Sequence, residues 1–264
     1  MSGLVATIEG LGFWAPGLPS WAAARAFVAD GTLAVDAPMR PVPRLLPANE
    51  RRRAPEGVAV ALEVALAACE SAGADPAQLS SVFTSTHGDM GITDYICSTL
   101  ASDPSTLSPT KFHNSVHNAA AGYWTIAAGC HAPATAVSSR DASFAQGLVE
   151  AMVQLAAGAD RVLLVAYDAA SPGPVGAVSR SEGLLGAALV LARRPRHGLP
   201  RLRATLVDAA TAPAAAAGDS LSRRLGANAM APMLPLFQAL AGGGDLVSLH
   251  AGPSRALRME IANG

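Results

Sequence analysis

The sequence predicts a layered α/β fold, and three observations carry that prediction. Short apolar segments alternate with longer segments of helical periodicity along the 264 residues, which is typical of a sheet covered by helices. RVLLVAY (161–167) is a continuous apolar run, as expected for a buried strand. Residues 56–72 space their small apolar residues for a closely packed helix. A chain of this length, 50% apolar, can bury one large core, so we expect a single domain over residues 1–264.

Strands are expected where short apolar or β-branched runs lie between turn residues. In chain order these runs are 3–10, 81–86, 135–139, 161–167, 184–193 and 201–210. Gly10 and Gly12 are expected to end the first strand. Residues 245–263 contain two further runs and predict a closing β-hairpin.

Helices are expected where apolar residues recur every three to four positions. They are 20–29, 56–72, 91–101, 114–129, 142–157 and 232–242. Ser20 is expected to cap the first of them, since a serine oxygen accepts a hydrogen bond from a free helix N–H. Gly129 and Gly158 are expected to end two others.

Three segments predict irregular structure between these elements. They are the arginine- and proline-rich residues 35–55, the glycine-, proline- and serine-rich residues 171–183, and a loose loop over 211–230.

Composition excludes several classes of protein. The formal net charge is −1 and basic residues do not interleave with aromatic ones, so a nucleic-acid partner is not expected. Cys69, Cys97 and Cys130 are too widely spaced for a disulfide framework or a zinc site, and they fit the reducing cytoplasm as packing residues. No apolar run reaches the ~18 residues of a membrane span. Neither a P-loop nor a strand-GxGxxG-helix unit is present, and we expect no cofactor.

The corner TAVSSRDASFAQG (135–147) joins a predicted strand to a predicted helix. Many enzymes place a nucleophile at such a turn, where the helix N-terminus offers N–H groups to a developing anion. Ser138 or Ser139 would need a histidine to act in this way. The alternative is that the polar residues cap the helix, with Asp141 in the first turn.

Three histidines are candidates for chemistry. His113 and His117 are four residues apart, which is metal-ligand spacing, but no third ligand is evident and we expect no metal. His87 follows a strand end, where α/β proteins place functional groups. The competing interpretation is a turn, in which Gly88 has positive φ and Asp89 caps the next helix.

Several segments in order carry a family resemblance. They are STHGDMG (85–91), SPTKFHNSVHNAAAGYWTIAAG (108–129), ATAVSSRDASFAQGLVEAM (134–152), GADRVLLVAYD (158–168) and EGLLGAALVLAR (182–193). Together they resemble the N-terminal half of a β-ketoacyl synthase, most of all the short ketosynthase-like proteins of aryl polyene pigment clusters. LPANERRRAPEGVAVALEVA (46–65) is similar to the arginine-rich stretch before the first long helix there. The resemblance spans about residues 5–195.

The resemblance implies a thiolase-like layered fold, with a mixed sheet flanked by helices, and a role in polyketide or fatty-acid-like chain elongation on acyl carrier protein. Full ketosynthases carry a nucleophilic cysteine at the strand-to-helix corner. Ungapped alignment places that position on Asp141, and a small gap places it on Ser139; neither residue forms the required thioester. We also find no motif here for the two histidines of a C-terminal half, and the chain ends before a second half of comparable size. We therefore expect no condensation by this chain alone.

The remaining role is a chain-length-factor-type subunit that pairs with an active ketosynthase as a heterodimer. In dimers of this family the strand before the nucleophile pairs across the two-fold axis and neighbouring helices line the acyl tunnel. The candidates implied for the interface or tunnel are Phe112, His113, Asn114, His117, Asn118, Tyr123, Trp124, Thr135, Val137, Ser139 and Phe144, with His87 and Asp89 as secondary candidates.

Two other functions stay open from sequence. The first is a stand-alone acyl-thioester hydrolase or transferase that uses Ser138 or Ser139 with a histidine. The second is a self-associating scaffold, a homodimer formed through the same strand edge.

Overall fold

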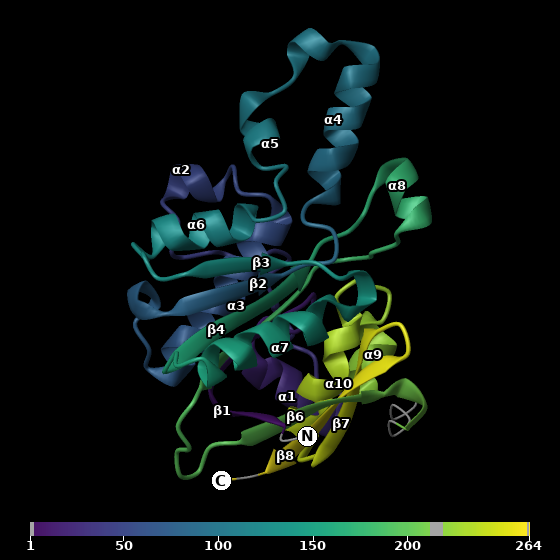
Figure 1. The fold of residues 1–264 in the computed structure, drawn as a ribbon. Coiled ribbons are helices and arrows are strands. Elements are labelled where there is room, and N and C mark those ends of the chain that lie inside the picture. The colour runs from purple at the N-terminus through teal and green to yellow at the C-terminus, as the bar shows by residue number, and fades with distance from the viewer. Residues whose placement is uncertain (1–2, 212–218, 263) are drawn as a thin grey trace.

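A computed structural model describes residues 3–211, 219–262 and 264, and eight strands form one mixed sheet (Figure 1). The strands are β1 (Leu4–Trp14), β2 (Ser80–Thr84), β3 (Ala134–Val137), β4 (Arg161–Asp168), β5 (Leu185–Ala192), β6 (Arg201–Asp208), β7 (Leu246–Gly252) and β8 (Arg255–Ala262). Their order across the sheet is β3-β2-β4-β5-β1-β6-β8-β7. β2 runs parallel to β3 and β4, and the other pairs are antiparallel. β3 and β7 are therefore the two edges.

Helices cover the sheet on both faces. The α-helices are α1 (Trp21–Asp30), α2 (Ala48–Arg51), α3 (Glu56–Ala72), α4 (Met90–Ser102), α5 (Pro109–His113), α6 (Ala119–Ala127), α7 (Ser143–Ala156), α8 (Gly173–Val178), α9 (Ser220–Leu225) and α10 (Leu234–Gly242). The 3-10 turns are η1 (Pro76–Gln78), η2 (Pro104–Thr106), η3 (Arg140–Ala142), η4 (Ala209–Thr211) and η5 (Ala231–Met233). α3 and α6 pack on one face, and α1, α7, α9 and α10 pack on the other. No described helix has the length and apolar character that crossing a membrane requires.

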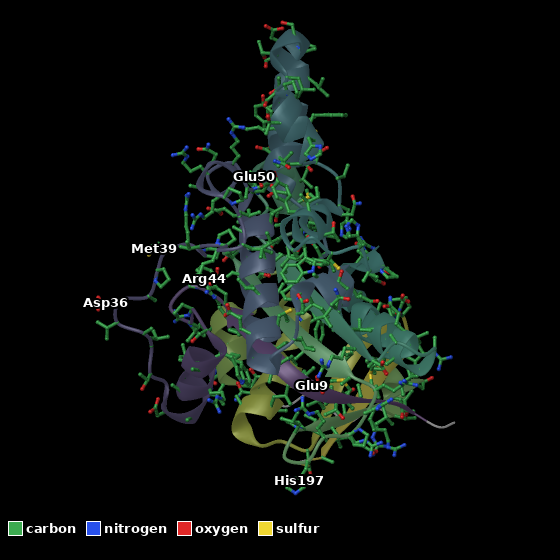
Figure 2. The ribbon with its side chains drawn as sticks, turned by 90° about the vertical axis from the view of Figure 1, so that its left-hand side faces the viewer. Glu9, Asp36, Met39, Arg44, Glu50 and His197 are labelled. Carbon is green, nitrogen blue, oxygen red and sulfur yellow. The ribbon has the colours of Figure 1, made fainter. Side chains whose placement is uncertain are left out.

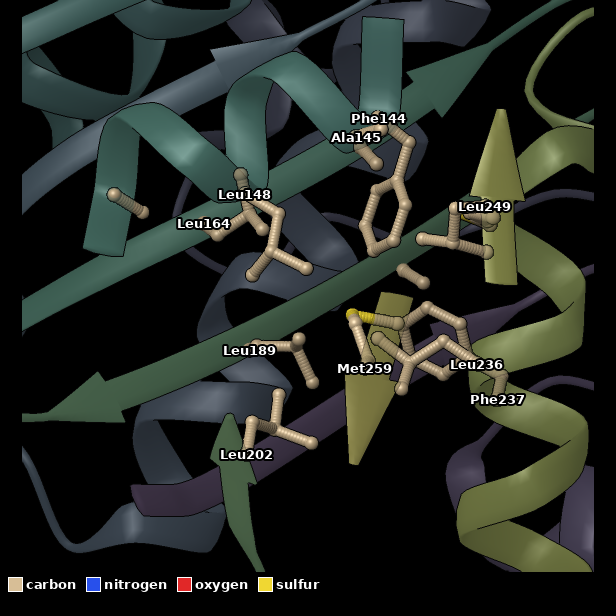
Figure 3. Packing of buried hydrophobic residues seen from close by; sticks show 14 of the residues in the cluster. Phe144, Ala145, Leu148, Leu164, Leu189, Leu202, Leu236, Phe237, Leu249 and Met259 are labelled. Atoms are coloured by element: carbon tan, nitrogen blue, oxygen red, sulfur yellow. The ribbon is translucent and has the colours of Figure 1, made fainter. Parts of the chain in front are cut away.

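The core on the α7 face joins distant parts of the chain. Phe144 at the start of α7 packs against Phe237 of α10, with ring centroids 6.1 Å apart. Leu249 of β7 and Met259 of β8 lie beside this pair in Figure 3. Apolar burial of this kind contributes about 25 cal/mol per Å², so the hairpin β7–β8 is an integral part of the domain.

β1 extends through Gly10 and Gly12 to Trp14, beyond the end predicted from the sequence. The two glycines do not end the strand; they let α3 approach it closely. A Cβ on Gly12 would lie 2.1 Å from the Val64 carbonyl oxygen, and one on Gly10 would lie 2.1 Å from that of Ala68.

We therefore expect Gly12→Ala to destabilise the fold by about 1–3 kcal/mol, because the added methyl group overlaps helix backbone. The measurement is the free energy of unfolding in urea. Gly122→Ala on α6 is the matched control, because its Cβ meets no atom within 4 Å. Equal stability of the two variants would contradict this account of β1 and α3.

Three predicted segments differ from the structure. The helix expected over 114–129 is shorter in the structure: residues 114–118 form a turn and α6 begins at Ala119. His113 ends the preceding helix α5, so His113 and His117 do not share a helix. The loop expected over 171–183 contains α8, which begins at Gly173-Pro174, and proline is favoured in a first helical turn. The loose loop expected over 211–230 contains α9, capped by Asp219; residues 212–218 lie outside the described residues.

Two segments project from the body. The arm from α4 to α5 rises above the sheet in Figure 1, and α4 contacts mainly α8 and α5. The segment 31–47 extends to the side in Figure 2, where Asp36 and Met39 mark its outer end. Within the predicted irregular segment 35–55, residues 48–51 form the single-turn helix α2.

Candidate functional site

The corner between β3 and α7 is built by a short network of its own. Arg140 has a left-handed φ of 54°. The Ser143 hydroxyl accepts a hydrogen bond from the Ser139 N–H at 2.9 Å and donates to the Arg140 carbonyl at 2.5 Å. The α7 N-cap is Ala142, and no side chain caps this helix. The expectation that Asp141 caps α7 is therefore wrong.

Asp141 instead faces the closing hairpin. Its Oδ2 lies 3.4 Å from His250 Nε2 on β7, and both side chains are largely exposed. Near the same place, the Gln146 amide donates to the Ala251 carbonyl at 2.6 Å. The corner that would hold a nucleophile thus holds a carboxylate beside an imidazole, and it carries no thiol.

The serines of the corner are not paired with a histidine among the described residues. Ser138 donates to the Thr86 carbonyl at 3.1 Å. His87 Nε2 is hydrogen-bonded to Ser179 Oγ at 2.5 Å, and His117 Nε2 lies 2.9 Å from the Ser85 carbonyl. His113 is exposed at the end of α5. A Ser-His-Asp arrangement at Ser138 or Ser139 therefore has no support in the geometry.

A buried polar network at the ends of β2 and β4 fixes the turn beside the corner. Asp168, 0% exposed, accepts hydrogen bonds from the Ser85 hydroxyl at 2.6 Å, the Thr86 N–H at 2.9 Å and the His87 N–H at 3.3 Å. Burial raises the pKa of Asp168, while these hydrogen bonds act in the opposite direction. Asp168 and Ser85 are functional residues that were not predicted from the sequence, although a polar residue that ends the buried run of β4 is a signal for such a role.

His87, Gly88 and Asp89 form the turn into α4. Gly88 has a φ of 71°, and its N–H donates to Ser85 Oγ at 2.8 Å. Asp89 caps α4 by accepting from the Ile92 N–H at 2.9 Å. Nδ1 of His87 is buried and has no hydrogen-bond partner among the described residues. This arrangement matches the turn interpretation of the three residues.

Asp89 gives a prediction about pH. Burial is the main cause that raises the pKa of Asp89, so the folded protein holds this proton more strongly than the unfolded chain does. Stability from Asp89 is present at acidic pH and is lost as pH rises through the folded pKa. Asn caps helices as well as Asp, so Asp89→Asn should lose this pH dependence while keeping the cap. Unfolding free energies of both proteins across pH 4 to 8 test this; parallel curves would contradict it.

No group of three or more metal-ligating side chains occurs in the described ranges. His113 lies on α5 and His117 in the turn before α6, where its ring contacts the end of β2. Cys69 and Cys130 are buried, and burial raises the pKa of the Cys69 thiol to about 12. Cys97 is exposed on α4, which differs from the packing role expected for it.

The β3 edge is open. Carbonyls of Pro133 and Val137 accept from the N–H groups of Ser81 and Ser85, so odd-numbered residues of β3 bond to β2. The N–H groups of Ala134 and Ala136 therefore point away from the sheet. Thr135, Val137 and Ser139 are half-buried.

A groove of about 430 Å³ runs along α6, beside this edge. Val116, Ala119, Gly122, Tyr123 and Ile126 form its apolar part, and Glu50, Arg53, Thr110, His113 and Asn118 complete its lining. Ile126 is 81% exposed and Phe112, close to the groove in sequence, is 60% exposed. We call the hollow formed by the ten lining residues, without Phe112, the α6 groove.

Two of the aromatic candidates lie in the core instead of on this surface. Trp124 is 0% exposed and packs near Phe83, and Phe144 packs against Phe237 (Figure 3). The sequence could not separate Trp124 from Tyr123, because the register of α6 after the turn at 114–118 was not known.

One mixed sheet with helices on both faces, and a strand-to-helix corner at its β3 edge, form a thiolase-like ketosynthase fold that solved structures share. A family model described as the β-ketoacyl synthase N-terminal domain matches residues 20–234. The chain belongs to this family. A search among curated protein sequences found no match.

Solved structures of similar fold include three assemblies. A ketosynthase in complex with its chain length factor from Xenorhabdus doucetiae has a TM-score of 0.74 at 23% identity, covering 97% of this chain and 99% of the other. A type II polyketide synthase acyl-carrier protein in complex with its ketosynthase gives 0.71 at 12% identity, with full coverage of both chains. The ishigamide ketosynthase/chain length factor has a TM-score of 0.67 at 16% identity, covering 98% of this chain and 99% of the other.

Proposed function

We propose that this protein is a non-catalytic, chain-length-factor-type subunit that pairs with an active β-ketoacyl synthase. The pair elongates an aryl polyene, polyketide or fatty-acid-like chain carried by acyl carrier protein. The observation that carries the proposal is the corner, where Asp141 stands beside His250 and no thiol is present. A condensing enzyme needs a thiolate there to hold the acyl group.

The corner is also electrostatically unsuited to condensation. An ionised carboxylate repels a malonyl carboxylate and the enolate that forms from it. Asp141 is exposed and points to His250 rather than into a covered site. The chemistry therefore belongs to a partner subunit.

The open β3 edge and the α6 groove support the pairing. Outward N–H groups on β3 offer hydrogen bonds to a second strand. The exposed apolar residues Phe112, Val116 and Ile126 lie on the α5–α6 segment, whose helix α6 contacts β3, and a partner that covered them would remove them from water. A partner seated over both would roof the α6 groove and convert it into a tunnel for an apolar acyl chain.

Charge supports contact with acyl carrier protein through the complex. Arg51, Arg52 and Arg53 follow one another at the end of α2, and none has an ion-pair partner within the described part of the chain. Arginine is suited to anionic groups such as phosphate and carboxylate. The free cysteines Cys69, Cys97 and Cys130 fit a cytoplasmic setting.

The test is reconstitution with a genuine ketosynthase of the same class. Co-expression is expected to give a stable heterodimer by gel filtration, and omission of this chain is expected to change product length and yield. The protein alone is expected to release no acyl group from acyl thioesters. Absence of a complex together with unchanged products would refute the proposal. Light scattering of the isolated chain separates it from a self-associating scaffold, for which the homodimer would persist when the ketosynthase is added.

A further inference from the structure

The segment 31–47 carries exposed apolar side chains on a part of the molecule that lies outside the corner, the β3 edge and the α6 groove. Val35 is 96% exposed and Met39 is 89% exposed, and Val42 is exposed as well. Asp36 and Met39 mark the outer end of the segment, where it extends to the side of the body (Figure 2). Apolar side chains gathered on one projection indicate an interaction site, whereas single ones scattered over a surface do not.

The base of this segment is fixed, so its apolar end is held outward. The Ala34 N–H donates to the Gly17 carbonyl at 3.3 Å. Arg44 donates two hydrogen bonds to the Glu70 carboxylate, at 3.0 and 2.8 Å. Pro41 is buried between these two anchors in the chain, and its ring restricts the backbone there. The projection is therefore formed before anything binds it, which lowers the entropic cost of binding.

Arginines lie beside the apolar residues. Arg40, Arg51 and Arg52 line a hollow of about 650 Å³ at the base of the segment, and Val42 lines it too. Arg40 pairs with Glu56 at 3.3 Å, and both of these side chains are exposed. Arg51 and Arg52 have no ion-pair partner among the described residues. Three arginines against one carboxylate leave this surface positive, so its complement is anionic.

Apolar side chains beside arginines match the two contacts that a phospholipid surface offers. Anionic head groups attract arginine, and the boundary of head groups and acyl chains accepts valine and methionine. Shape favours the same occupant. A flat protein surface would touch only the end of such a projection, whereas lipid closes around a side chain that is exposed on all sides.

We propose that the segment 31–47 docks this protein on an anionic phospholipid surface, with Val35 and Met39 inserted at the boundary of head groups and acyl chains. The arginines of the hollow bind the lipid phosphates at the same time. Asp36 is the one carboxylate within residues 31–47 and opposes this attraction. The inference stands apart from the proposed pairing, because the β3 edge takes no part in it.

The experiment is co-sedimentation of the full chain with phospholipid vesicles. Vesicles of phosphatidylcholine with about 30% phosphatidylglycerol supply the anionic surface, and vesicles of phosphatidylcholine alone are the neutral comparison. The wild-type protein is expected to bind the anionic vesicles about tenfold more tightly. Salt at about 0.5 M should remove most of this difference, because it screens the arginines. Equal binding to both kinds of vesicle, or binding to neither, would overturn the inference.

Variants locate the contact. Met39→Asp is expected to weaken binding to anionic vesicles about tenfold, because the inserted apolar side chain is lost and a negative charge is added. Val178→Asp on α8 is the matched control, since Val178 is also 89% exposed; it should bind as the wild type does. Asp36→Ala is expected to tighten binding about fivefold by removing the opposing carboxylate. Equal binding by Met39→Asp and Val178→Asp would overturn the inference.

A protein partner for this segment would give a different result. Met39→Asp would then weaken binding of the ketosynthase or of acyl carrier protein, and the wild-type chain would not sediment with vesicles; that outcome overturns the inference. We expect Met39→Asp to leave both protein contacts unchanged. Gel filtration and product length test the proposed function, so either proposal can fail while the other stands.

Discussion

Replacing Ala136 with proline is expected to weaken pairing with the ketosynthase strongly while leaving the isolated chain folded. The Ala136 N–H points away from the sheet, so its loss removes no hydrogen bond within this chain. A strand added at this edge would need that N–H, and it would also meet the proline ring. We expect the dissociation constant to rise about a hundredfold, which corresponds to ~3 kcal/mol.

The measurement is surface-based or calorimetric binding of the purified ketosynthase, with circular dichroism as the check on folding. Ala136→Ser is the matched control, because it keeps the N–H at the same exposed position. Unchanged affinity in Ala136→Pro would show that the subunits meet through another face. The α6 residues Ile126 and Tyr123 would then be the next sites to change.

Removal of the Asp168 carboxylate is expected to cause the largest loss of stability. Asp168→Ala leaves the Ser85 hydroxyl and the Thr86 and His87 N–H groups without their acceptor at the ends of β2 and β4. Each unpaired buried donor costs about 1–3 kcal/mol, so we expect a total loss of about 3–5 kcal/mol. The Ser85–Gly88 turn carries Asp89 into α4, and the arm should lose its fixed position as well.

Urea unfolding measures the global effect, and hydrogen exchange of residues 85–102 measures the local one. Asp36→Ala, far out on the projecting segment in Figure 2, is the matched control and should be within about 0.5 kcal/mol of the wild type. If Asp168→Ala changed the free energy of unfolding as little as Asp36→Ala does, water would be able to replace the Asp168 carboxylate, and its hydrogen bonds would not define the turn.

Much of the fold followed from local sequence because the relevant signals are local. α3 occupies residues 56–72 as predicted, and β4 lies on the apolar run RVLLVAY. The break between α5 and α6 was not predictable in this way. His117 turns to the Ser85 carbonyl there, and a contact between residues so far apart leaves no periodic signal in an alanine-rich segment. The sequence predicts strand ends at Gly10 and Gly12 for the same reason, since only the position of α3 reveals why glycine is needed there.

In the candidate site, too, the features set by neighbouring residues were predictable from the sequence and the long-range contacts were not. The absence of a cysteine at the corner was visible from the sequence, and so was the turn formed by Gly88 and Asp89. The contact between Asp141 and His250 was not visible from the sequence, because His250 belongs to the closing hairpin and approaches Asp141 only in the folded chain. Ser85 and Asp168 are likewise brought together from 83 positions apart. Burial of Trp124 depended on a helix register that the sequence left undetermined.

The open β3 strand also bears on how a cell must produce this protein. An edge with outward N–H groups is a template for unwanted strand addition. A chain made in excess of the ketosynthase partner proposed above would present that edge to other unpaired copies and to the proteases that remove orphan chains. Matched synthesis of the two subunits, and their association soon after translation, would then be a requirement for keeping this chain in solution.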